Sequence, residues 1–191
     1  MQVESYPEAA VPAALRAQVH ELQNQAWPSD PPPPADTPVH DPALHPLSML
    51  LVDEGLVVAA LDVLRKPLQH SGTTFRAGGL STVVTRETLR GRGYGHQLVA
   101  AARDVMADLR LDLGLFTCDR ALQPFYESAG WQHLAGTVLI GGTPDDPFPS
   151  DQPGFDKVTL AAFFTSTARQ LAPTFRNARI GLYPGSIDKL W

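Results

Sequence analysis

The stretch that decides the fold is Leu89–Leu98, which reads LRGRGYGHQL and places three glycines and two arginines between Arg90 and Gly95. The β-branched residues Thr82–Thr85 precede it, which is typical of a strand. From Gly93 to Leu109, apolar residues recur three and four positions apart, which predicts a helix. Unpaired N–H groups and a positive dipole at a helix start attract anions, and glycines let a phosphate approach the backbone. The sequence therefore predicts a phosphate-binding turn between a strand and a helix.

This turn does not fit the two best-known nucleotide motifs. A Walker loop is excluded because His96 and Gln97 stand where a lysine and a hydroxyl residue are needed. The dinucleotide pattern GxGxxG is met at Gly91 and Gly93, but its third glycine falls on His96. A dinucleotide-dependent oxidoreductase and a turn with a purely structural role remain as alternatives.

The segments around the turn predict a mixed α/β domain. Helical spacing of apolar residues predicts a helix over 12–27, which ends at the proline-rich loop 28–38. Two apolar runs around Asp53-Glu54-Gly55 predict a β-hairpin. The strand before the helix and the run 111–118 after it form a βαβ unit, whose strands are parallel. Further elements are expected at 73–85 (extended), 121–128 (helix), 131–140 (strand), 157–164 (strand) and 166–171 (helix), before an irregular tail.

Length and composition narrow the function classes. A chain of 191 residues with 43% apolar content predicts one domain over 1–191, with a C-terminal extension from about residue 165. A net charge of −5 without basic runs argues against a nucleic-acid partner. No apolar run approaches the roughly 18 to 20 residues of a membrane span, so a cytoplasmic protein with no membrane partner is expected.

Cysteine and histidine give no reason to expect a metal. Cys118 is the only cysteine, which excludes an intramolecular disulfide and a cysteine zinc site and favours a buried apolar thiol. His40 and His45 flank Asp41, but they lack helical register and a further ligand. Surface histidines are therefore expected, and no metal site.

Two blocks of sequence carry a family resemblance. Arg90-x-x-Gly93-x-Gly95, followed by an apolar helix, resembles the coenzyme A motif of the GNAT superfamily of N-acetyltransferases. The block Phe125–Trp131, FYESAGW, is similar to the second signature of that superfamily. The resemblance implies acetyl-CoA as cofactor, flanking helices and a mostly antiparallel central sheet with a parallel strand pair that splays apart. It places the cofactor on backbone groups of Val83, Val84 and Thr85 and on the turn residues Arg90, Gly91, Arg92, Gly93, Tyr94, Gly95 and His96.

Acetyl transfer to an amine requires a neutral nucleophile, a polarised carbonyl and a proton for the departing thiolate. By the resemblance, Tyr126 matches a tyrosine placed near the sulfur of the coenzyme and is the expected general acid. Ser81 stands where related enzymes often carry a carboxylate base, so it is a catalytic candidate only through an ordered water. The base stays open between water held by Ser81, Thr82 or Thr117 and a carboxylate of Asp30, Asp119 or Asp146.

Within the superfamily, the chain most resembles the aminoglycoside 2'-N-acetyltransferases. The shared features are the Arg90-Gly91 turn, Tyr126 with Gly130-Trp131, the loop Thr143-Pro144-Asp145-Asp146 and Trp191. The resemblance implies that Asp30, Ser81, Thr82, Thr117, Asp146 and the Trp191 carboxylate face the substrate. Acidic groups are what the protonated amines of such a substrate require.

The sequence therefore predicts an N-acetyltransferase that acts on a primary amine of a small molecule, by direct attack in a ternary complex. The main alternative is an acyl-CoA-binding module without catalysis. The sequence leaves open whether the protein forms a homodimer.

Overall fold

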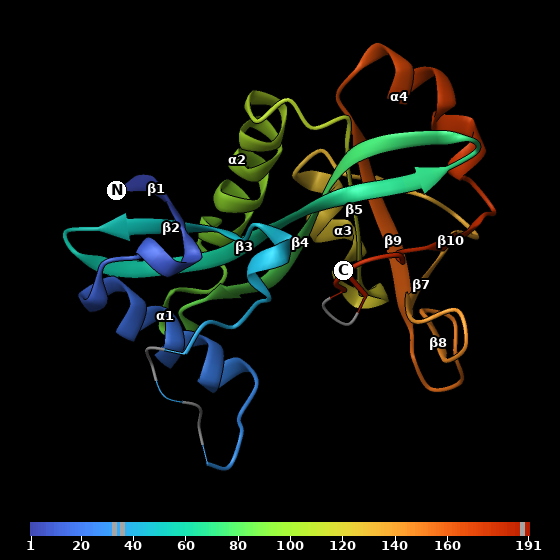
Figure 1. Ribbon diagram of the computed structural model, residues 1–191. Helices are drawn as coiled ribbons and strands as arrows, with labels where there is room; N and C mark the ends of the chain where they lie inside the picture. The colour runs from blue at the N-terminus through green and yellow to red at the C-terminus, as the bar shows by residue number, and fades with distance from the viewer. Residues whose placement is uncertain (32–33, 35–36, 188–189) are drawn as a thin grey trace.

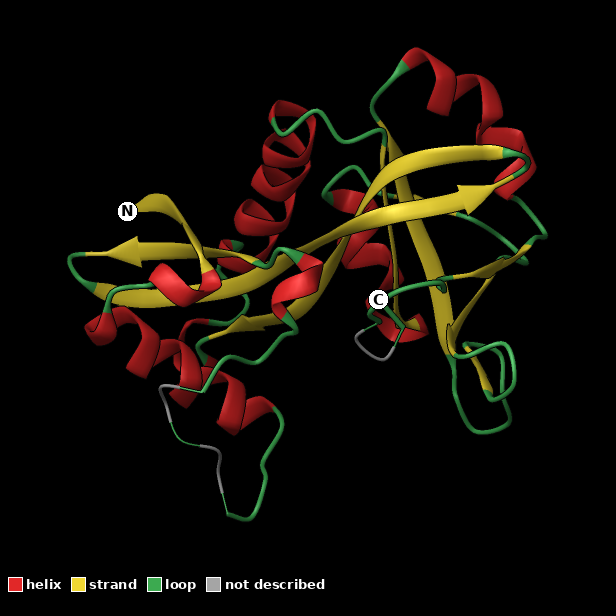
Figure 2. Cartoon of the chain, viewed as in Figure 1, coloured by secondary structure: helices red, strands yellow, loops and turns green. Residues whose placement is uncertain are grey.

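The computed structural model describes residues 1–31, 34, 37–187, 190 and 191, which form two β-sheets with helices packed around them (Figures 1 and 2). The larger sheet has seven strands in the order β1-β2-β3-β4-β5-β9-β6, and the smaller sheet has the order β10-β7-β8. The strands are β1 (Gln2–Pro7), β2 (Leu47–Asp53), β3 (Leu56–His70), β4 (Thr73–Thr85), β5 (Leu113–Asp119), β6 (Gln132–His133), β7 (Val138–Gly142), β8 (Pro147–Pro149), β9 (Lys157–Phe163) and β10 (Arg179–Gly181). The α-helices are α1 (Ala13–Ala26), α2 (Tyr94–Asp108), α3 (Gln123–Ser128) and α4 (Ser166–Leu171).

In the larger sheet β4 and β5 run parallel, whereas the other described strand pairs are antiparallel. The connection between β4 and β5 is α2, which confirms the predicted βαβ unit. The expected fold class, a mostly antiparallel sheet with one parallel pair and flanking helices, is therefore confirmed.

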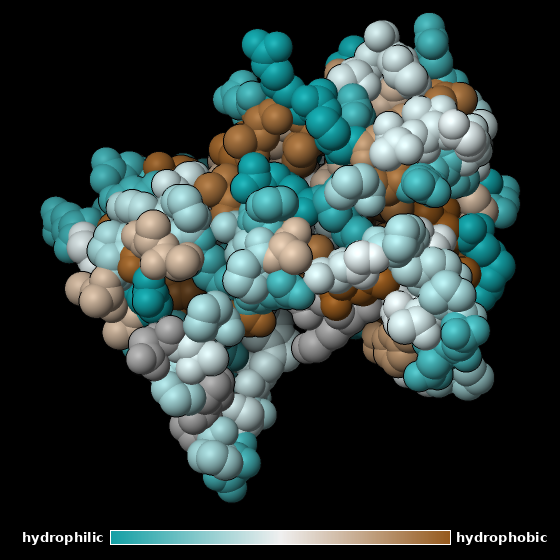
Figure 3. All heavy atoms as spheres, in the orientation of Figure 1, coloured by the Kyte–Doolittle hydropathy of each residue, from teal (hydrophilic) through white to brown (hydrophobic). Residues whose placement is uncertain are grey.

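Helices α1 and α2 cover opposite faces of the first half of the sheet. Successive side chains of a strand point to opposite faces. On β2, Leu50 and Val52 pack in the cluster that contains Leu22 of α1. Met49 and Leu51 pack in the cluster that contains the buried face of α2. On the face seen in Figure 3, hydrophobic atoms show mainly along α2 and in the middle of the molecule, between the two halves of the sheet.

Strand β4 carries a bulge close to its end. Between the pairs Ala60–Val84 and Asp62–Ser81, β4 has two residues where β3 has one. Thr82, one of the two, has a φ of 49°, in the left-handed region. A bulge bends a strand and changes the direction of its side chains. The bulge therefore changes the direction of Thr82 and Val83 relative to the regular strand that ends at Ser81.

Several elements differ from the sequence expectation. Residues 131–140 are two strands in different sheets, because Gly136 turns the chain at a φ of 71° between β6 and β7. The N-terminal β1 and the tail strand β10 were not expected, since both are short and lie at sheet edges. Of the proline-rich loop, residues 32–33 and 35–36 lie outside the described residues, and the remainder is exposed. None of the described helices is long and apolar enough to span a bilayer.

Candidate functional site

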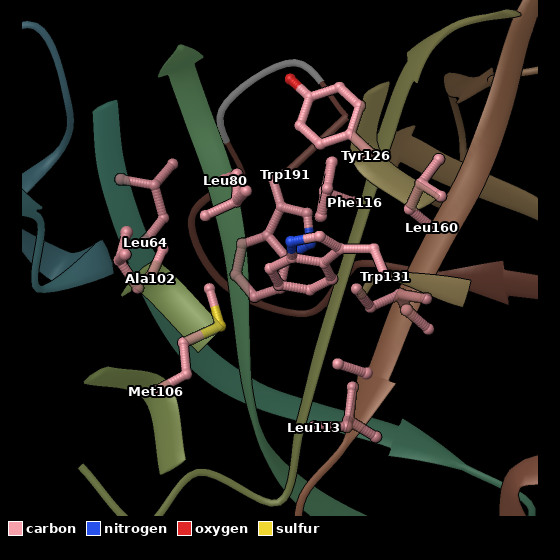
Figure 4. Packing of buried hydrophobic residues seen from close by; sticks show 14 of the residues in the cluster. Leu64, Leu80, Ala102, Met106, Leu113, Phe116, Tyr126, Trp131, Leu160 and Trp191 are labelled. Atoms are coloured by element: carbon pink, nitrogen blue, oxygen red, sulfur yellow. The ribbon is translucent and has the colours of Figure 1, made fainter. Parts of the chain in front are cut away.

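Strands β4 and β5 pair at Ala77–Leu113 and Gly78–Gly114 and then separate. The gap begins at Gly79, where an added Cβ would collide with the ring of Trp191. Figure 4 shows this ring between the two strands, and the residue is only 2% exposed. The indole therefore fills the start of the gap, and Gly79 makes room for it.

The tail that ends in Trp191 is tied to the first half of the molecule. Lys66 of β3 is buried and donates hydrogen bonds to the carbonyl oxygens of Leu182 at 2.5 Å and Ser186 at 2.7 Å. The hydroxyl of Ser186 donates to Asp41 Oδ2 at 2.7 Å. These contacts hold the tail against β3 and lead it toward the gap.

A pocket of about 580 Å³ lies beside the gap. Ser81 and Thr82 line it from β4 and Thr117 lines it from β5, together with Trp191. Other lining residues are His20, Gln23 and Asn24 of α1, Trp27 directly after it, Phe155 just before β9 and Lys157 at its start. The structure thus brings together four of the residues that were predicted to face the substrate.

The two aspartates that were predicted to face the substrate do not line this pocket. Asp30 is exposed after α1, and Asp146 is exposed in the turn between β7 and β8. In that turn, the amide of Asp146 donates to Thr143 Oγ1 at 3.0 Å. Neither aspartate is among the described residues that line the pocket.

The glycine turn lies between the end of β4 and the start of α2. Gly91 has a φ of 75°, and Gly93, the residue that caps α2, has a φ of 83°. A Cβ at either position would meet no atom within 4 Å, so the space beside these backbone groups is open. The first N–H groups of a helix have no carbonyl partner within it. An anion can therefore approach the backbone at this turn, as the sequence predicts.

The arginines of the turn are exposed, and Arg90 Nε donates to the carbonyl oxygen of Thr85 at 3.2 Å. A Cβ on Gly95 would lie 2.6 Å from Thr85 Oγ1, so this glycine lets the first turn of α2 pack against the end of β4. The other residues predicted at the cofactor site surround the turn: Val83, Tyr94 and His96 are half-buried, Arg92 is exposed and Val84 is buried on the side of α1.

Tyr126 of α3 is 5% exposed, and its ring packs edge-on against Phe116 and Phe125. Figure 4 shows its hydroxyl pointing away from Phe116 and Trp131. Burial raises the pKa of Tyr126, and Cys118 and Asp119 raise it further. The phenol is therefore neutral and able to donate a proton over the ordinary pH range.

His40 is a site residue that the sequence reasoning missed. It was expected at the surface, whereas it is 4% exposed because its ring lies between Ser81 and Glu8. Its Nε2 is 3.0 Å from Ser81 Oγ, and its Nδ1 is 3.4 Å from Glu8 Oε1. His45, its neighbour in the loop, is exposed as expected. No sequence pattern links the three residues, because they come from distant segments of the chain.

Asp62 of β3 is a second polar residue that was missed. It is 3% exposed and accepts hydrogen bonds from Ser48 Oγ at 2.5 Å and from Thr82 Oγ1. Burial raises its pKa, while His40 and the two hydroxyls oppose that rise. An aspartate within the apolar run Leu56–Leu64 was a signal available in the sequence, since an acid there needs buried partners.

Cys118 is buried, and burial together with Asp119 raises the pKa of its thiol to about 12. The predicted burial of this thiol is confirmed. The described residues contain no group of three or more His, Cys, Asp or Glu side chains that would hold a metal ion.

The comparison with known families identifies the fold. Residues 11–134 match the family described as Acetyltransferase (GNAT) domain. This range contains the gap, the glycine turn, Ser81 and Tyr126. None of the curated protein sequences compared with the chain matches it significantly.

Solved structures of acetyltransferases share the fold at low sequence identity. A GNAT family N-acetyltransferase (YhbS) from Escherichia coli in complex with CoA has a TM-score of 0.63 at 19% identity, over 95% of this chain and 89% of that chain. An aminoglycoside 6'-N-acetyltransferase complexed with coenzyme A has a TM-score of 0.60 at 15% identity, over 86% and 98% of the two chains. An acyl-CoA N-acyltransferase from Pseudomonas aeruginosa has a TM-score of 0.57 at 19% identity, over 84% and 97%.

The family match spans more than half of the residues, and the splayed parallel pair beside a glycine turn agrees with it. The chain therefore belongs to the GNAT family of acetyltransferases.

Proposed function

We propose that this protein transfers the acetyl group of acetyl-CoA to a primary amine of a small molecule, by direct attack within a ternary complex. The observation that carries the proposal is the pocket beside the gap between β4 and β5, at the strand end that leads into the glycine turn. The two structures with the same fold that hold coenzyme A support the choice of cofactor.

The turn suits the phosphate groups of coenzyme A. Gly91 and Gly93 leave the backbone open to a ligand, and exposed Arg90 and Arg92 add positive charge beside it. When bound, acetyl-CoA supplies an activated acetyl thioester. Beyond Gly78, no described residue of β4 pairs with β5, so this side of β4 near Val83 and Val84 offers backbone groups to the amides of the pantetheine arm, while the carbonyl of Thr85 accepts from Arg90.

Tyr126 is the proposed proton donor for the departing sulfur. Support comes from its raised pKa, which keeps the phenol protonated, and from its position against Phe116 of β5. Asp119, which the sequence left open as a base, forms an ion pair with Lys157 at 2.6 Å. A carboxylate engaged in this way is a weaker candidate for accepting a proton.

The pocket walls indicate the kind of acceptor. Trp27, Phe155 and Trp191 offer aromatic surface, and Gln23 and Asn24 offer amide groups. A small primary amine with an apolar body and a few hydroxyl or amino groups fits these walls. Aminoglycosides and simpler amines both belong in the panel that tests the proposal.

The first test measures cofactor binding with a matched pair of variants. Acetyl-CoA is expected to raise the melting temperature of the wild type, whereas NAD leaves it unchanged. Gly93→Ala and Gly55→Ala each place a side chain at a positive φ, 83° and 84°, with no atom within 4 Å of the new Cβ. Each substitution should therefore lower the free energy of unfolding by a similar amount, about 1 kcal/mol. Gly93→Ala alone should weaken acetyl-CoA binding, by about tenfold or more.

Gly55 lies in the turn between β2 and β3, outside the glycine turn and the pocket, and so serves as the control. Equal acetyl-CoA affinity in the two variants contradicts the proposal that the glycine turn binds the phosphate groups of coenzyme A. Release of free thiol on addition of an amine then tests transfer. A wild type that binds acetyl-CoA but releases no thiol with any amine contradicts the proposed activity and supports a binding module.

A further inference from the structure

Three polar side chains form a chain from the pocket into the protein. Ser81 lines the pocket, its Oγ is 3.0 Å from His40 Nε2, and His40 Nδ1 is 3.4 Å from Glu8 Oε1. We propose that Ser81 and His40, held by Glu8, form the relay that removes the proton from the attacking amine. The inference rests on the proposed function and supplies the base that a carboxylate on β4 would otherwise provide.

Ser81 is the member that reaches the substrate. It is partly exposed to the pocket, at the last regular pair before the bulge of β4, opposite Asp62. The ring of His40 has no exposed surface. The hydroxyl of Ser81, which contacts His40 Nε2, therefore gives a ligand in the pocket a route to the buried imidazole.

Glu8 orients the imidazole. Burial would raise the pKa of Glu8, but its interaction with the side chain of His40 and the hydrogen bond from the amide of Val39 outweigh burial and lower it. That amide donates to Oε1 at 2.7 Å, which fixes the carboxylate. An ionised Glu8 favours a proton on Nδ1 of His40 and leaves the lone pair of Nε2 directed at Ser81. Nε2 is then the atom that accepts a proton.

Titratable groups from several described elements lie near His40. Glu8 lies in the short 3₁₀ helix Glu8–Ala10, Asp62 on β3, and Arg16 and His20 on α1. These four line one small cavity of about 40 Å³. Arg16 is occupied by the carbonyl oxygens of Ala9 and Val11. Glu8 is an acid that contacts the ring of His40 directly, so its carboxylate favours an imidazolium when it forms.

The proton transfers balance. The amine nitrogen bonds to the acyl carbon and the carbon–sulfur bond breaks, with its electron pair on sulfur. The proton lost from nitrogen goes to Ser81 Oγ while the hydroxyl proton of Ser81 moves to His40 Nε2. The sulfur takes a proton from Tyr126. After the product leaves, the proton on His40 returns to solvent through Ser81, and Tyr126 takes a proton from solvent.

Kinetics provide the first test. His40→Asn and Ser81→Ala are expected to lower kcat by about 100-fold, the usual scale for general-base catalysis, with little change in KM for acetyl-CoA. The wild-type rate should fall at acid pH as His40 becomes protonated, and His40→Asn should lose that dependence. The matched control is His45→Asn, since His45 is exposed and its φ of 46° is one that asparagine tolerates. Unchanged kcat and pH profile in His40→Asn overturn the relay.

A second measurement needs no activity. In the wild type without ligands, ¹⁵N-histidine NMR reports which ring nitrogen carries the proton, and His40→Asn identifies the signal of His40. The relay requires a proton on Nδ1 and none on Nε2 at neutral pH, and Glu8→Gln should weaken that preference. A proton on Nε2 overturns the relay, whether or not any amine is acetylated.

Intact-mass measurement separates the relay from covalent catalysis. Acetyl-CoA without amine should leave the mass of the protein unchanged, because Ser81 passes a proton and does not attack the thioester. An acetyl group retained on Ser81 overturns the relay. Failure of the proposed function has a different signature: the NMR pattern of His40 is present, but no amine releases thiol from acetyl-CoA.

Discussion

Asp62 illustrates how a single buried acid makes the stability of this fold depend on pH. Burial raises the pKa of Asp62, while His40, Ser48 and Thr82 oppose the rise without cancelling it. The folded protein therefore binds a proton at this carboxyl more tightly than the unfolded chain does. Such a group stabilises the fold fully below the pKa of the unfolded chain, 3.8, and the contribution is lost as the pH rises through the pKa of the folded state.

We expect Asp62→Asn to remove this part of the pH dependence. The free energy of unfolding of the wild type should fall, relative to that of the variant, as the pH rises from about 4 toward 8. Urea unfolding at several pH values measures the difference. Asp104→Asn, on the exposed side of α2, is the control substitution. A difference between wild type and Asp62→Asn that is constant over this range contradicts the expectation.

Tyr126 allows the proposed chemistry to be separated from packing. Tyr126→Phe keeps the ring that contacts Phe116 and Phe125 and removes only the hydroxyl. We expect kcat to fall by about 10- to 100-fold, with KM for acetyl-CoA and the melting temperature nearly unchanged. Tyr6→Phe on β1, whose hydroxyl bonds Glu4, is the control. Equal losses of kcat and of acetyl-CoA affinity would indicate a structural tyrosine.

At the scale of elements, β4 and β5 separate at the point where the indole ring of Trp191 packs against Gly79. Gly79 follows Gly78, the last residue of β4 that pairs with β5. A Cβ on Gly79 would occupy space that the ring of Trp191 takes. The ring lies between the two strands, and only 2% of the residue is exposed (Figure 4). The tail residue and the strand therefore act as one packing unit.

A double-mutant cycle tests this coupling. Gly79→Ala should cost about 1 to 3 kcal/mol of unfolding free energy, the usual cost of overpacking a core. In a Trp191→Ala background the same change should cost much less, because the space is then empty. Urea unfolding of the four proteins gives the coupling energy. Additive effects of the two substitutions would show that the indole does not restrict Gly79.

Helices and strands with a strong apolar periodicity were predicted well from the sequence. Those whose formation depends on contacts with distant segments were predicted poorly. Helix α1, the β2–β3 hairpin and α2 were predicted within a few residues, because their apolar spacing reflects one buried face. Strand β1 was missed because it lies at an edge of the sheet and keeps alternate residues exposed. The single strand expected over 131–140 failed because Gly136, at positive φ, passes the chain from one sheet to the other.

At the scale of the whole molecule, the candidate site is assembled from segments far apart in the chain. The glycine turn was predicted because its residues are contiguous, and Ser81, Thr82 and Thr117 because they lie beside recognisable strands. The contacts of His40 with Glu8 and Ser81 depend on how three segments pack. A sequence pattern cannot report such packing, so His40, just after the proline-rich loop, was expected to be exposed.

The hydrogen bonds between Lys66 and the tail also depend on the order in which the chain is synthesised. Lys66 binds the carbonyl oxygen of Leu182, a residue 116 positions later. A ribosome adds roughly 5 to 20 residues per second, so on the order of 6 to 23 seconds pass before that partner is synthesised. The glycine turn leaves the ribosome well before Trp191 does. During synthesis, the part of the protein proposed to bind the cofactor therefore exists before the acceptor pocket is complete.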